Sequence, residues 1–313
     1  MKIAITGASG FIGTALRRAL SGHELIALRR GHTAVAPDIM WNPDSGHLSP
    51  RDLEGVDAVI NLAGENIGAK RWTVTQKARL LESRTRGTAL LVRAFERMDR
   101  PPSVFLSASA IGYYGANCGD TVLDERAPAG NDFLADLCVE WERAALAASD
   151  IGVRVATLRT GIVLDPSGGV LARQLPAFKL GLGGRQGPGT QWMSWITLTD
   201  HVRATRFILD NDSVDGPVNL VSPDPVTNAA FAKTLGNALH RPTFLPTPMA
   251  PLKALYGSEL VTSLLLASQR CQPRRLQQGG FVFEQPTLDS AFASMNIGPS
   301  KRSGTHVHSG RER

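Results

Sequence analysis

Short apolar runs recur along the first half of the chain, and each is bounded by turn-forming residues. Runs of this length predict strands buried on both faces of a sheet, and they occupy 3–5, 24–28, 57–62, 104–107 and 153–158. Between them, apolar residues return every three or four positions, as on one face of an amphipathic helix. Helices are therefore expected after Gly10, at 75–97 and at 133–148. Strands that alternate with helices predict an α/β fold with a doubly wound parallel sheet and right-handed crossovers.

The first predicted strand leads into a glycine-rich turn. Gly7, Gly10 and Gly13 follow the strand, and an amphipathic helix begins among them. The unpaired amides and the dipole of a helix N-terminus attract the phosphates of a ligand. Glycine is needed where a side chain would hold the backbone away from a pyrophosphate or from a neighbouring strand. The alternative, a turn rich in glycine for flexibility, would not need the strand and helix on either side. We expect a Rossmann-type dinucleotide site formed by Gly7, Ser9, Gly10, Phe11, Ile12 and Gly13.

The end of the second predicted strand indicates which dinucleotide binds. An NAD enzyme usually has an acidic residue about 20 residues after the glycine turn, where it holds the ribose 2′-hydroxyl. This chain has Arg29 and Arg30 there and no carboxylate. Guanidinium groups hold a 2′-phosphate through charge-assisted, bidentate hydrogen bonds. The expected cofactor is therefore NADP; the alternative is that both arginines are only solvated.

The hydrophobic pattern changes after Leu164. Glycine-rich segments at 166–169 and 181–189 are too long to be simple connectors, so they are candidates for covering a substrate. A strand and a helix at about 190–222 are expected to return to the sheet. The predicted division is a cofactor domain at 1–164, substrate-covering loops with a helical domain at 165–297, and a basic tail at 298–313.

Helices are also predicted in the second half of the chain. Thr199 and Asp200 are expected to cap a helix at 201–209. The remaining predicted helices lie at 228–239, 252–269, 273–278 and 287–295. A ligand is expected at the carboxyl edge of the sheet, where open α/β sheets bind their ligands.

Composition excludes several classes of protein. With 313 residues and 42% hydrophobic content the chain can bury a large core, but no apolar run approaches the ~20 residues of a membrane span. The N-terminus is committed to the nucleotide fold and is not expected to be a signal peptide. Of the net charge of +6, four basic residues against Glu312 place +3 in the tail, so no nucleic-acid partner is indicated. The polar tail beyond Gly298 is expected to be disordered.

The cysteines and histidines give no sign of a metal site. Cys118, Cys138 and Cys271 lie far apart and lack the spacing of metal ligands. The seven histidines are scattered along the chain. A sparse, odd number of cysteines fits a reducing compartment, so we expect a cytoplasmic protein with no metal and no membrane partner.

Several segments together resemble a known family. They are the turn 6–13, the segments 61–67 and 107–115, and the stretch 181–184 followed by Trp195-Ile196. The chain resembles the extended short-chain dehydrogenases/reductases, and within them the atypical "epimerase family" branch, which is related to NAD-dependent epimerases and dehydratases. That branch carries its own C-terminal domain. The resemblance covers residues 1 to about 295, and its motifs are specific for the fold rather than for one activity.

The resemblance implies further contacts with the cofactor. Ala63 and Gly64 are small enough for adenosine and ribose to lie close, and the segment around Ile162 passes the nicotinamide in this fold. Arg84 lies where the family points a basic residue at the cofactor, although a surface arginine fits the sequence equally well. The implied set is Leu62, Ala63, Gly64, Arg84, Ser107 and Ile162.

The residues expected to carry the chemistry depart from the usual pattern. In short-chain dehydrogenases a serine fixes the carbonyl, and a Tyr-x-x-x-Lys pair transfers the proton. Here the corresponding helix has Phe133 and Leu137, and neither can exchange a proton. Ser109 is the candidate serine, unless it is only a small turn residue. Tyr113 is the candidate acid, unless it is a wall of the substrate cleft; Glu65 is another candidate acid or base. Without a lysine, Tyr113 suits donating a proton to a carbonyl better than accepting one.

Two functions of different classes remain open. The first is an NADP(H)-binding oxidoreductase or a nucleotide-sugar-epimerase-like enzyme with a rearranged acid and a small-molecule substrate that the sequence does not name. The second is an NADP(H)-binding sensor or interaction protein without turnover. The glycine turn fits both, the lost pair favours the second, and the glycine-rich covering segments favour the first. A homodimer is compatible with either function.

Overall fold

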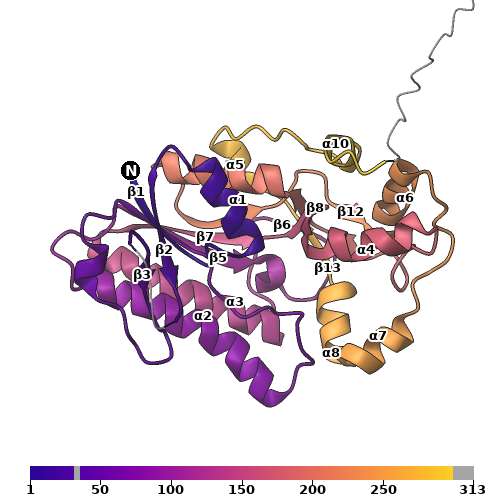
Figure 1. Cartoon of the computed structure of the whole chain (residues 1–313). Helices are drawn as coiled ribbons and strands as arrows, with labels where there is room; N and C mark the ends of the chain where they lie inside the picture. The colour runs from indigo at the N-terminus through magenta and orange to yellow at the C-terminus, as the bar shows by residue number, and fades with distance from the viewer. Residues whose placement is uncertain (32–35, 299–313) are drawn as a thin grey trace, which may run out of the picture.

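Seven parallel strands form one sheet at the centre of the computed structural model, which describes residues 1–31 and 36–298 (Figure 1). The strand order is β11-β7-β5-β4-β1-β2-β3. The strands are β1 Lys2–Thr6, β2 Glu24–Arg29, β3 Ile39–Met40, β4 Ala58–Asn61, β5 Val104–Ala110, β7 Arg154–Thr160 and β11 Gly216–Leu220. Because the order runs outward from β1 in both directions, the predicted doubly wound, Rossmann-type α/β fold is confirmed.

Helices cover both faces of this sheet (Figure 1). On one face lie α1 (Phe11–Ala19) and α5 (Leu198–Asp210), and on the other lie α2 (Val74–Phe95) and α3 (Phe133–Leu146). Ile5 of β1 packs in the same hydrophobic cluster as Ile208 of α5. Phe105 of β5 packs in the opposite cluster with Leu91 of α2. Since alternate side chains of a strand point to opposite faces, each short apolar run supplies both clusters.

Parallel pairing brings the ends of the strands together at one edge. Thr6 of β1 is level with Asn61 of β4, and Asn61 is level with Ser107 of β5. Farther along, Ala110 of β5 is level with Thr160 of β7. The turns that follow these strands hold most of the predicted site residues, so the register of the sheet assembles them at its carboxyl edge.

The rest of the described chain forms further helices and two-stranded sheets. The helices are α4 Gly169–Lys179, α6 Asn228–Leu239, α7 Met249–Tyr256, α8 Ser258–Leu260, α9 Arg274–Gln278 and α10 Leu288–Ser294. The short strands are β6 Asn117–Leu123, β8 Ile162–Asp165, β9 Trp192–Met193, β10 Trp195–Thr197, β12 Val226–Thr227 and β13 Ser268–Cys271. Short 3-10 segments are η1 Pro50–Leu53, η2 Ile111–Tyr114 and η3 Ala147–Ile151, and a π turn, η4, spans Val261–Leu265. Helices α4, α6 and α10 pack around one hydrophobic core with Trp195 of β10. Phe231 of α6 and Phe292 of α10 belong to this core.

The helix predicted at 252–269 is wrong. Helix α7 starts earlier and ends at Tyr256, because Gly257 takes a φ of +89° that a continuing helix does not allow. After α8 and η4, residues Ser268–Cys271 form strand β13, which pairs in parallel with β6. Side chains there alternate between half-buried and buried. The sequence Ser-Gln-Arg-Cys has no apolar–polar alternation, because one of the two buried positions is the polar Gln269, so only the fold reveals this strand.

The predicted cap of α5 is also wrong. The helix begins at Leu198, and the side chain of Thr197, not Thr199, accepts the hydrogen bond from the Asp200 amide at 3.0 Å. Thr197 is extended, so its hydroxyl faces the open amides of the first turn. The Asp200 carboxylate instead accepts from the backbone amides of 284–285, at 3.0 and 2.8 Å.

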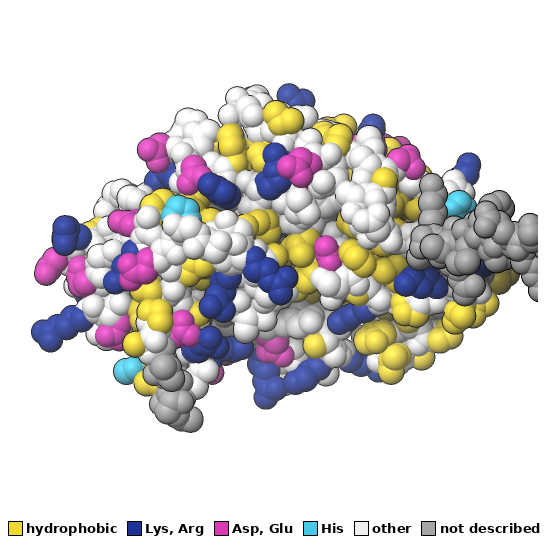
Figure 2. All heavy atoms as spheres, turned by 45° about the horizontal axis from the view of Figure 1, so that its top comes forward, with side chains coloured by type: hydrophobic (Ala, Val, Ile, Leu, Met, Phe, Trp, Pro, Cys, Tyr) yellow, Lys and Arg dark blue, Asp and Glu magenta, His cyan; other side chains and the backbone are white. Residues whose placement is uncertain are grey.

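Two features concern the surface of the molecule. In the part of the chain that the structure describes, no helix combines the length and the apolar character needed to cross a membrane. Basic and acidic side chains are interspersed over the face shown in Figure 2. The predicted disordered tail lies outside the described residues, apart from Gly298.

Candidate functional site

The glycine turn has no room for side chains. Gly7 has a φ of +65°, and a Cβ there would lie 2.9 Å from the carbonyl carbon of Leu62. A Cβ on Gly13 would lie 2.2 Å from the carbonyl oxygen of Gly7. Gly10 precedes α1 and gives it no side-chain cap, while its amide donates to the Gly7 oxygen at 2.9 Å. An uncapped helix start beside a turn packed this closely suits a pyrophosphate, so the residues present fit a dinucleotide.

The other predicted turn residues have different surroundings. Ser9 is exposed, whereas Ile12 is half-buried and packs against the core of the sheet. The ring of Phe11 lies so close to Gly168 that a Cβ at Gly168 would be 2.5 Å from the Phe11 Cδ2. The first glycine-rich segment, predicted to cover a substrate, therefore contacts the cofactor turn through Phe11.

A buried polar chain holds the end of β4 against the turn. The Thr6 hydroxyl accepts from the Leu62 and Ala63 amides, both at 3.0 Å, and donates to the Asn61 side chain at 2.7 Å. The Asn61 amide donates to the Thr88 hydroxyl at 2.9 Å. Ser107 is fully buried nearby, with its hydroxyl 3.5 Å from the Asn61 nitrogen. These contacts fix Leu62 and Ala63, and they place Ser107 beneath the edge.

Arg84 lies directly against Gly64. A Cβ on Gly64 would be 3.2 Å from the Arg84 Cζ, and the guanidinium stacks over Trp141 with 5.1 Å to the ring centroid. Arg84 donates to the carbonyl oxygens of Leu80 at 2.9 Å and Glu65 at 3.0 Å, and its buried Nε has no partner among the described residues. Burial lowers the pKa of Arg84. Arg84 is thus packed between Gly64 and Trp141 and is not a surface arginine.

An acid that the sequence reasoning missed, Asp38, lies beside the end of β2 and directly precedes β3. Asp38 folds back against β2, accepts from the Ala27 amide at 3.1 Å, and forms an ion pair with Arg29. Burial by itself raises the pKa of Asp38, but the hydrogen bonds from Arg29 and Ala27 and the positive charge of Arg29 outweigh it, so the pKa lies below its usual range. Arg30 is exposed and has neither an ion pair nor a side-chain hydrogen bond within residues 1–31 and 36–298. Of the two arginines predicted to bind a 2′-phosphate, Arg29 is paired with Asp38, whereas Arg30 has no partner in the part of the chain that the structure describes.

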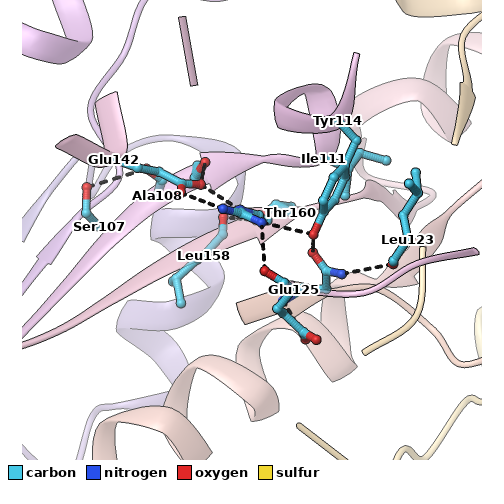
Figure 3. Close-up of polar contacts among 12 residues, drawn as sticks. Ser107, Ala108, Ile111, Tyr114, Leu123, Glu125, Glu142, Leu158 and Thr160 are labelled. Atoms are coloured by element: carbon cyan, nitrogen blue, oxygen red, sulfur yellow. Dashed lines mark hydrogen bonds and ion pairs between the residues drawn. The ribbon is translucent and has the colours of Figure 1, made fainter. Parts of the chain in front are cut away.

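A buried ion pair lies beneath the ends of β5 and β7 (Figure 3). Arg159 of β7 makes a two-pronged pair with Glu142 of α3, at 2.8 and 2.9 Å. The Ser109 hydroxyl donates to the same carboxylate at 2.6 Å. All three side chains are nearly inaccessible to solvent. Burial alone would lower the pKa of Arg159, but hydrogen bonding and attraction to Glu142 raise it. Ser109 would have to turn away from Glu142 before it could donate to a carbonyl.

The two tyrosines of η2 meet the same arginine. The Tyr114 hydroxyl accepts from Arg159 at 3.1 Å and donates to the Asn219 side chain at 2.7 Å. Burial raises the pKa of Tyr114. Tyr113 is only half-buried, and the Arg159 guanidinium lies 3.4 Å from the centroid of its ring. Tyr113 is therefore the accessible phenol of the pair, and Tyr114 is a structural anchor.

The places of the usual proton-transfer pair are apolar. Phe133, at the start of α3, packs edge-on against Trp72 at 5.2 Å between ring centroids. Leu137 is buried in the same cluster, to which the C-terminal part of the chain adds Tyr256 and Leu264. The predicted acid or base Glu65 accepts a hydrogen bond from the Gln76 amide. A lysine near these positions comes from another helix: the ammonium of Lys77, from α2, lies over the Phe133 ring, 5.1 Å from its centroid, and pairs with Glu259.

Ile162 is the last of the predicted site residues. Ile162 is half-buried at the start of β8, and its amide donates to the Ser194 carbonyl at 2.9 Å. In the described ranges, no group of three or more His, Cys, Asp or Glu side chains is arranged to hold a metal.

A cavity of about 380 Å³ lies elsewhere, beside the amino end of β11. Its walls include the ion pairs Arg274–Asp124 and Arg275–Asp215.

Comparison with known proteins identifies relatives of this arrangement. The family described as NAD dependent epimerase/dehydratase matches residues 3–221, which span the seven-stranded sheet and the site. The chain belongs to this family. Within it, the predicted branch with its own C-terminal domain is confirmed, since a domain of unknown function matches residues 247–295, from α7 to α10.

Other members of the NAD dependent epimerase/dehydratase family resemble the chain over nearly its whole length. An epimerase family protein of Mycobacterium bovis is 44% identical over 299 residues, which cover 95% of this chain and 98% of the relative. The human epimerase family protein SDR39U1, solved with NADPH, has a TM-score of 0.84 and 33% identity, covering 95% of this chain and 99% of that one. A nucleoside-diphosphate sugar epimerase from Corynebacterium glutamicum has a TM-score of 0.78 and 33% identity, with 95% and 58% coverage.

The family assignment agrees with the turn geometry, which is that of an NAD(P)-binding fold. Sequence reasoning missed Glu142 and Arg159, although both gave a signal. Arg159 directly follows the apolar run 153–158, and Glu142 lies among apolar residues of a helix. Charged residues in such positions are almost always paired when they are buried.

Proposed function

We propose that this chain is an oxidoreductase that uses NADP(H) to reduce a carbonyl group of a small molecule, with Tyr113 as the proton donor. The observation that carries the proposal is the position of Tyr113. Its segment, η2, directly follows β5 at the carboxyl edge, and its ring lies 3.4 Å from a buried guanidinium. The glycine turn follows β1, two strands away in the same sheet. A phenol held by rigid elements beside a dinucleotide turn is suited to general acid catalysis.

Each part of the site then has a role. The backbone amides of the glycine turn would hold the pyrophosphate, and Leu62 to Gly64 would accommodate adenosine and ribose. Bound NADPH would supply a hydride to the carbonyl carbon. Tyr113 would donate its proton to the carbonyl oxygen and afterwards take one from water. The apolar cluster around Phe133 would limit the access of water to that side of the site.

The arginines at the end of β2 support NADP(H) over NAD(H). Asp38, the acid that could hold a ribose hydroxyl, is already engaged by Arg29 and the Ala27 amide. Arg30 is exposed beside them and can receive a 2′-phosphate through charge-assisted hydrogen bonds. The similar human protein was solved with NADPH. A cytoplasmic location is part of the proposal, because all three cysteines are free thiols.

The test is a screen of aldehydes and ketones in which the loss of NADPH absorbance is followed. Tyr113→Phe should lower the rate roughly 10²–10⁴-fold, the usual contribution of a general acid. Tyr256→Phe is the matched control: it removes only the hydroxyl of a half-buried tyrosine of α7 and keeps the ring that packs in the apolar cluster around Phe133. Full activity in Tyr113→Phe would remove Tyr113 from the mechanism.

Two specific observations favour alternatives. The similarity to the Corynebacterium sugar epimerase favours a nucleotide-sugar epimerase, which consumes no net NADPH; nucleotide sugars should therefore be included and their products examined by NMR. The engaged hydroxyl of Ser109 and the apolar Phe133 and Leu137 favour a non-catalytic NADP(H) sensor. Tight NADPH binding without oxidation or epimerisation across the whole screen would make the sensor the better conclusion.

A further inference from the structure

The strongest unexplained feature is a permanent positive charge buried under the ring of Tyr113. Arg159 is 3% exposed, and its guanidinium plane is fixed by two hydrogen bonds to Glu142. A buried charge pair is costly to desolvate, and well-packed apolar residues often stabilise a fold as well or better. Stability alone is therefore a weak reason for this pair to lie here. Its contact with Tyr113, at 3.4 Å from the ring centroid, supplies another reason.

The segment that carries Tyr113 is held from several sides. The Gln269 side chain, from β13, donates to the carbonyl oxygens of Ile111 at 3.1 Å and Gly115 at 2.7 Å. The Tyr113 carbonyl itself accepts from the Gly130 amide at 2.9 Å. Tyr114 anchors the other end of the segment through its hydroxyl. The backbone is thus fixed. The Tyr113 ring packs edge-on against Tyr114, with 5.3 Å between centroids, and Arg159 is the charged group that lies against its face.

We propose that Arg159 is the positioning residue for Tyr113 and supplies the positive charge that a lysine supplies in the usual pair. The inference rests on the proposed function of Tyr113 as the acid. When the Tyr113 hydroxyl gives its proton to a carbonyl oxygen, negative charge spreads into the ring. A cation over the ring face stabilises that charge, and more strongly in a desolvated site. Glu142 accepts a hydrogen bond from Ser109 and holds the guanidinium of Arg159 in place.

The charged and titratable groups around Arg159 come from three elements and from the turn after β6. They are Glu142 of α3, Tyr113 and Tyr114 of η2, Cys271 of β13, and Glu125, whose backbone carbonyl accepts from Arg159 at 3.4 Å. Burial raises the pKa of the Cys271 thiol to about 12, so that group stays neutral. Arg159 therefore presents one unit of positive charge to η2, partly balanced by Glu142 on the side away from it.

The experiment separates positioning from simple structural support. Arg159→Met alone leaves the buried Glu142 carboxylate without its cationic partner, with the Ser109 hydrogen bond remaining, and is expected to destabilise the fold. The double variant Glu142→Gln/Arg159→Met removes both charges and should restore stability, measured by thermal unfolding. Arg159→Lys keeps the charge but loses the two-pronged geometry.

Two readouts are then compared with the wild-type protein. The chain has three tyrosines, so labelling with 3-fluorotyrosine gives three ¹⁹F signals, assigned with Tyr-to-Phe variants in the apo protein. In the double variant the Tyr113 signal should move and the Tyr256 signal should not. In the enzyme assay kcat should fall roughly 30-fold, the size of a desolvated cation–π interaction. The alkaline limb of the pH–rate profile should also shift to higher pH, and Arg159→Lys should recover part of the rate.

Two outcomes would overturn the proposal. One is a stable double variant with an unchanged Tyr113 signal; the other is a stable double variant with wild-type kcat and an unmoved alkaline limb. If the wild-type protein shows no turnover, the proposed function fails, whereas the ¹⁹F signals still decide whether Arg159 orients Tyr113. The two failures are therefore distinguishable.

Discussion

Replacing Gly13 with alanine should damage both the fold and the cofactor site. Gly13 lies inside α1, where alanine would normally stabilise a helix by about 1 kcal/mol. Here the new Cβ would lie 2.2 Å from the Gly7 carbonyl oxygen, which is backbone and cannot rotate away. The turn must therefore move. Overpacking of this severity costs about 3 kcal/mol, so the net loss of stability is about 2 kcal/mol.

The expected change in melting temperature follows from the size of the chain. With about 2.1 cal/mol/K of unfolding entropy per residue, 313 residues give about 0.66 kcal/mol/K, so a loss of about 2 kcal/mol lowers Tm by about 3 °C. The displaced turn should also lose at least one charge-assisted hydrogen bond to the pyrophosphate. That loss weakens NADPH binding by roughly 10-fold or more.

Differential scanning fluorimetry and isothermal titration calorimetry measure the two effects. Gly22→Ala is the matched control, because Gly22 is exposed and a Cβ there meets no atom within 4 Å. That variant should keep its NADPH affinity and lose no stability. If Gly13→Ala behaves like Gly22→Ala in both measurements, the close-packed turn is not what positions the amides.

Two further predictions concern cofactor choice and pH. Arg30→Ala should weaken NADPH binding roughly 10-fold or more, through the lost contacts to the 2′-phosphate, and should leave NADH binding unchanged; calorimetry showing equal losses for both cofactors would contradict the assignment. Burial lowers the pKa of His201 to about 4, against about 6.5 in an unfolded chain, so between these values the unfolded state binds a proton that the folded state does not. Stability should therefore decrease as the pH falls through this window, by up to roughly 3 kcal/mol in total. His201→Gln should flatten the curve in urea unfolding while the exposed His47→Gln should not, and an unaltered pH dependence in His201→Gln would refute the reasoning.

Most of the sheet could be predicted from the sequence because each strand is a short apolar run bounded by turn-forming residues. The runs 24–28 and 104–107 lie within β2 and β5, and the predicted helix 228–239 coincides with α6. The glycine turn was equally readable, because the glycine spacing, the strand and the helix give the same answer over a few residues. Parallel register then determines which turns meet at one edge, so several site residues could be placed together in advance.

The parts that could not be predicted depend on contacts between distant segments. Asp38 pairs with Arg29 across nine positions of the sequence, and no local pattern places that carboxylate there. The pair of Glu142 with Arg159 joins a helix to a strand, and Tyr113 enters it through η2. The sequence positions of Glu142 and Arg159 indicate that each charge is buried and needs a partner. The fold is needed to identify that partner.

The strand pairing of β13 with β6 has a consequence for the order in which the protein is made. Gln269, which holds both ends of η2, lies 158 residues after Ile111. At synthesis rates of about 5–20 residues per second, the clamp leaves the ribosome roughly 8–30 s after the segment it fixes. The last strand of the sheet, β11, ends at Leu220, so a nascent chain can complete its sheet before Gln269 secures the Tyr113 segment. A chain interrupted before β13 would contain every strand of the seven-stranded sheet and the glycine turn, but would lack the Gln269 hydrogen bonds to η2.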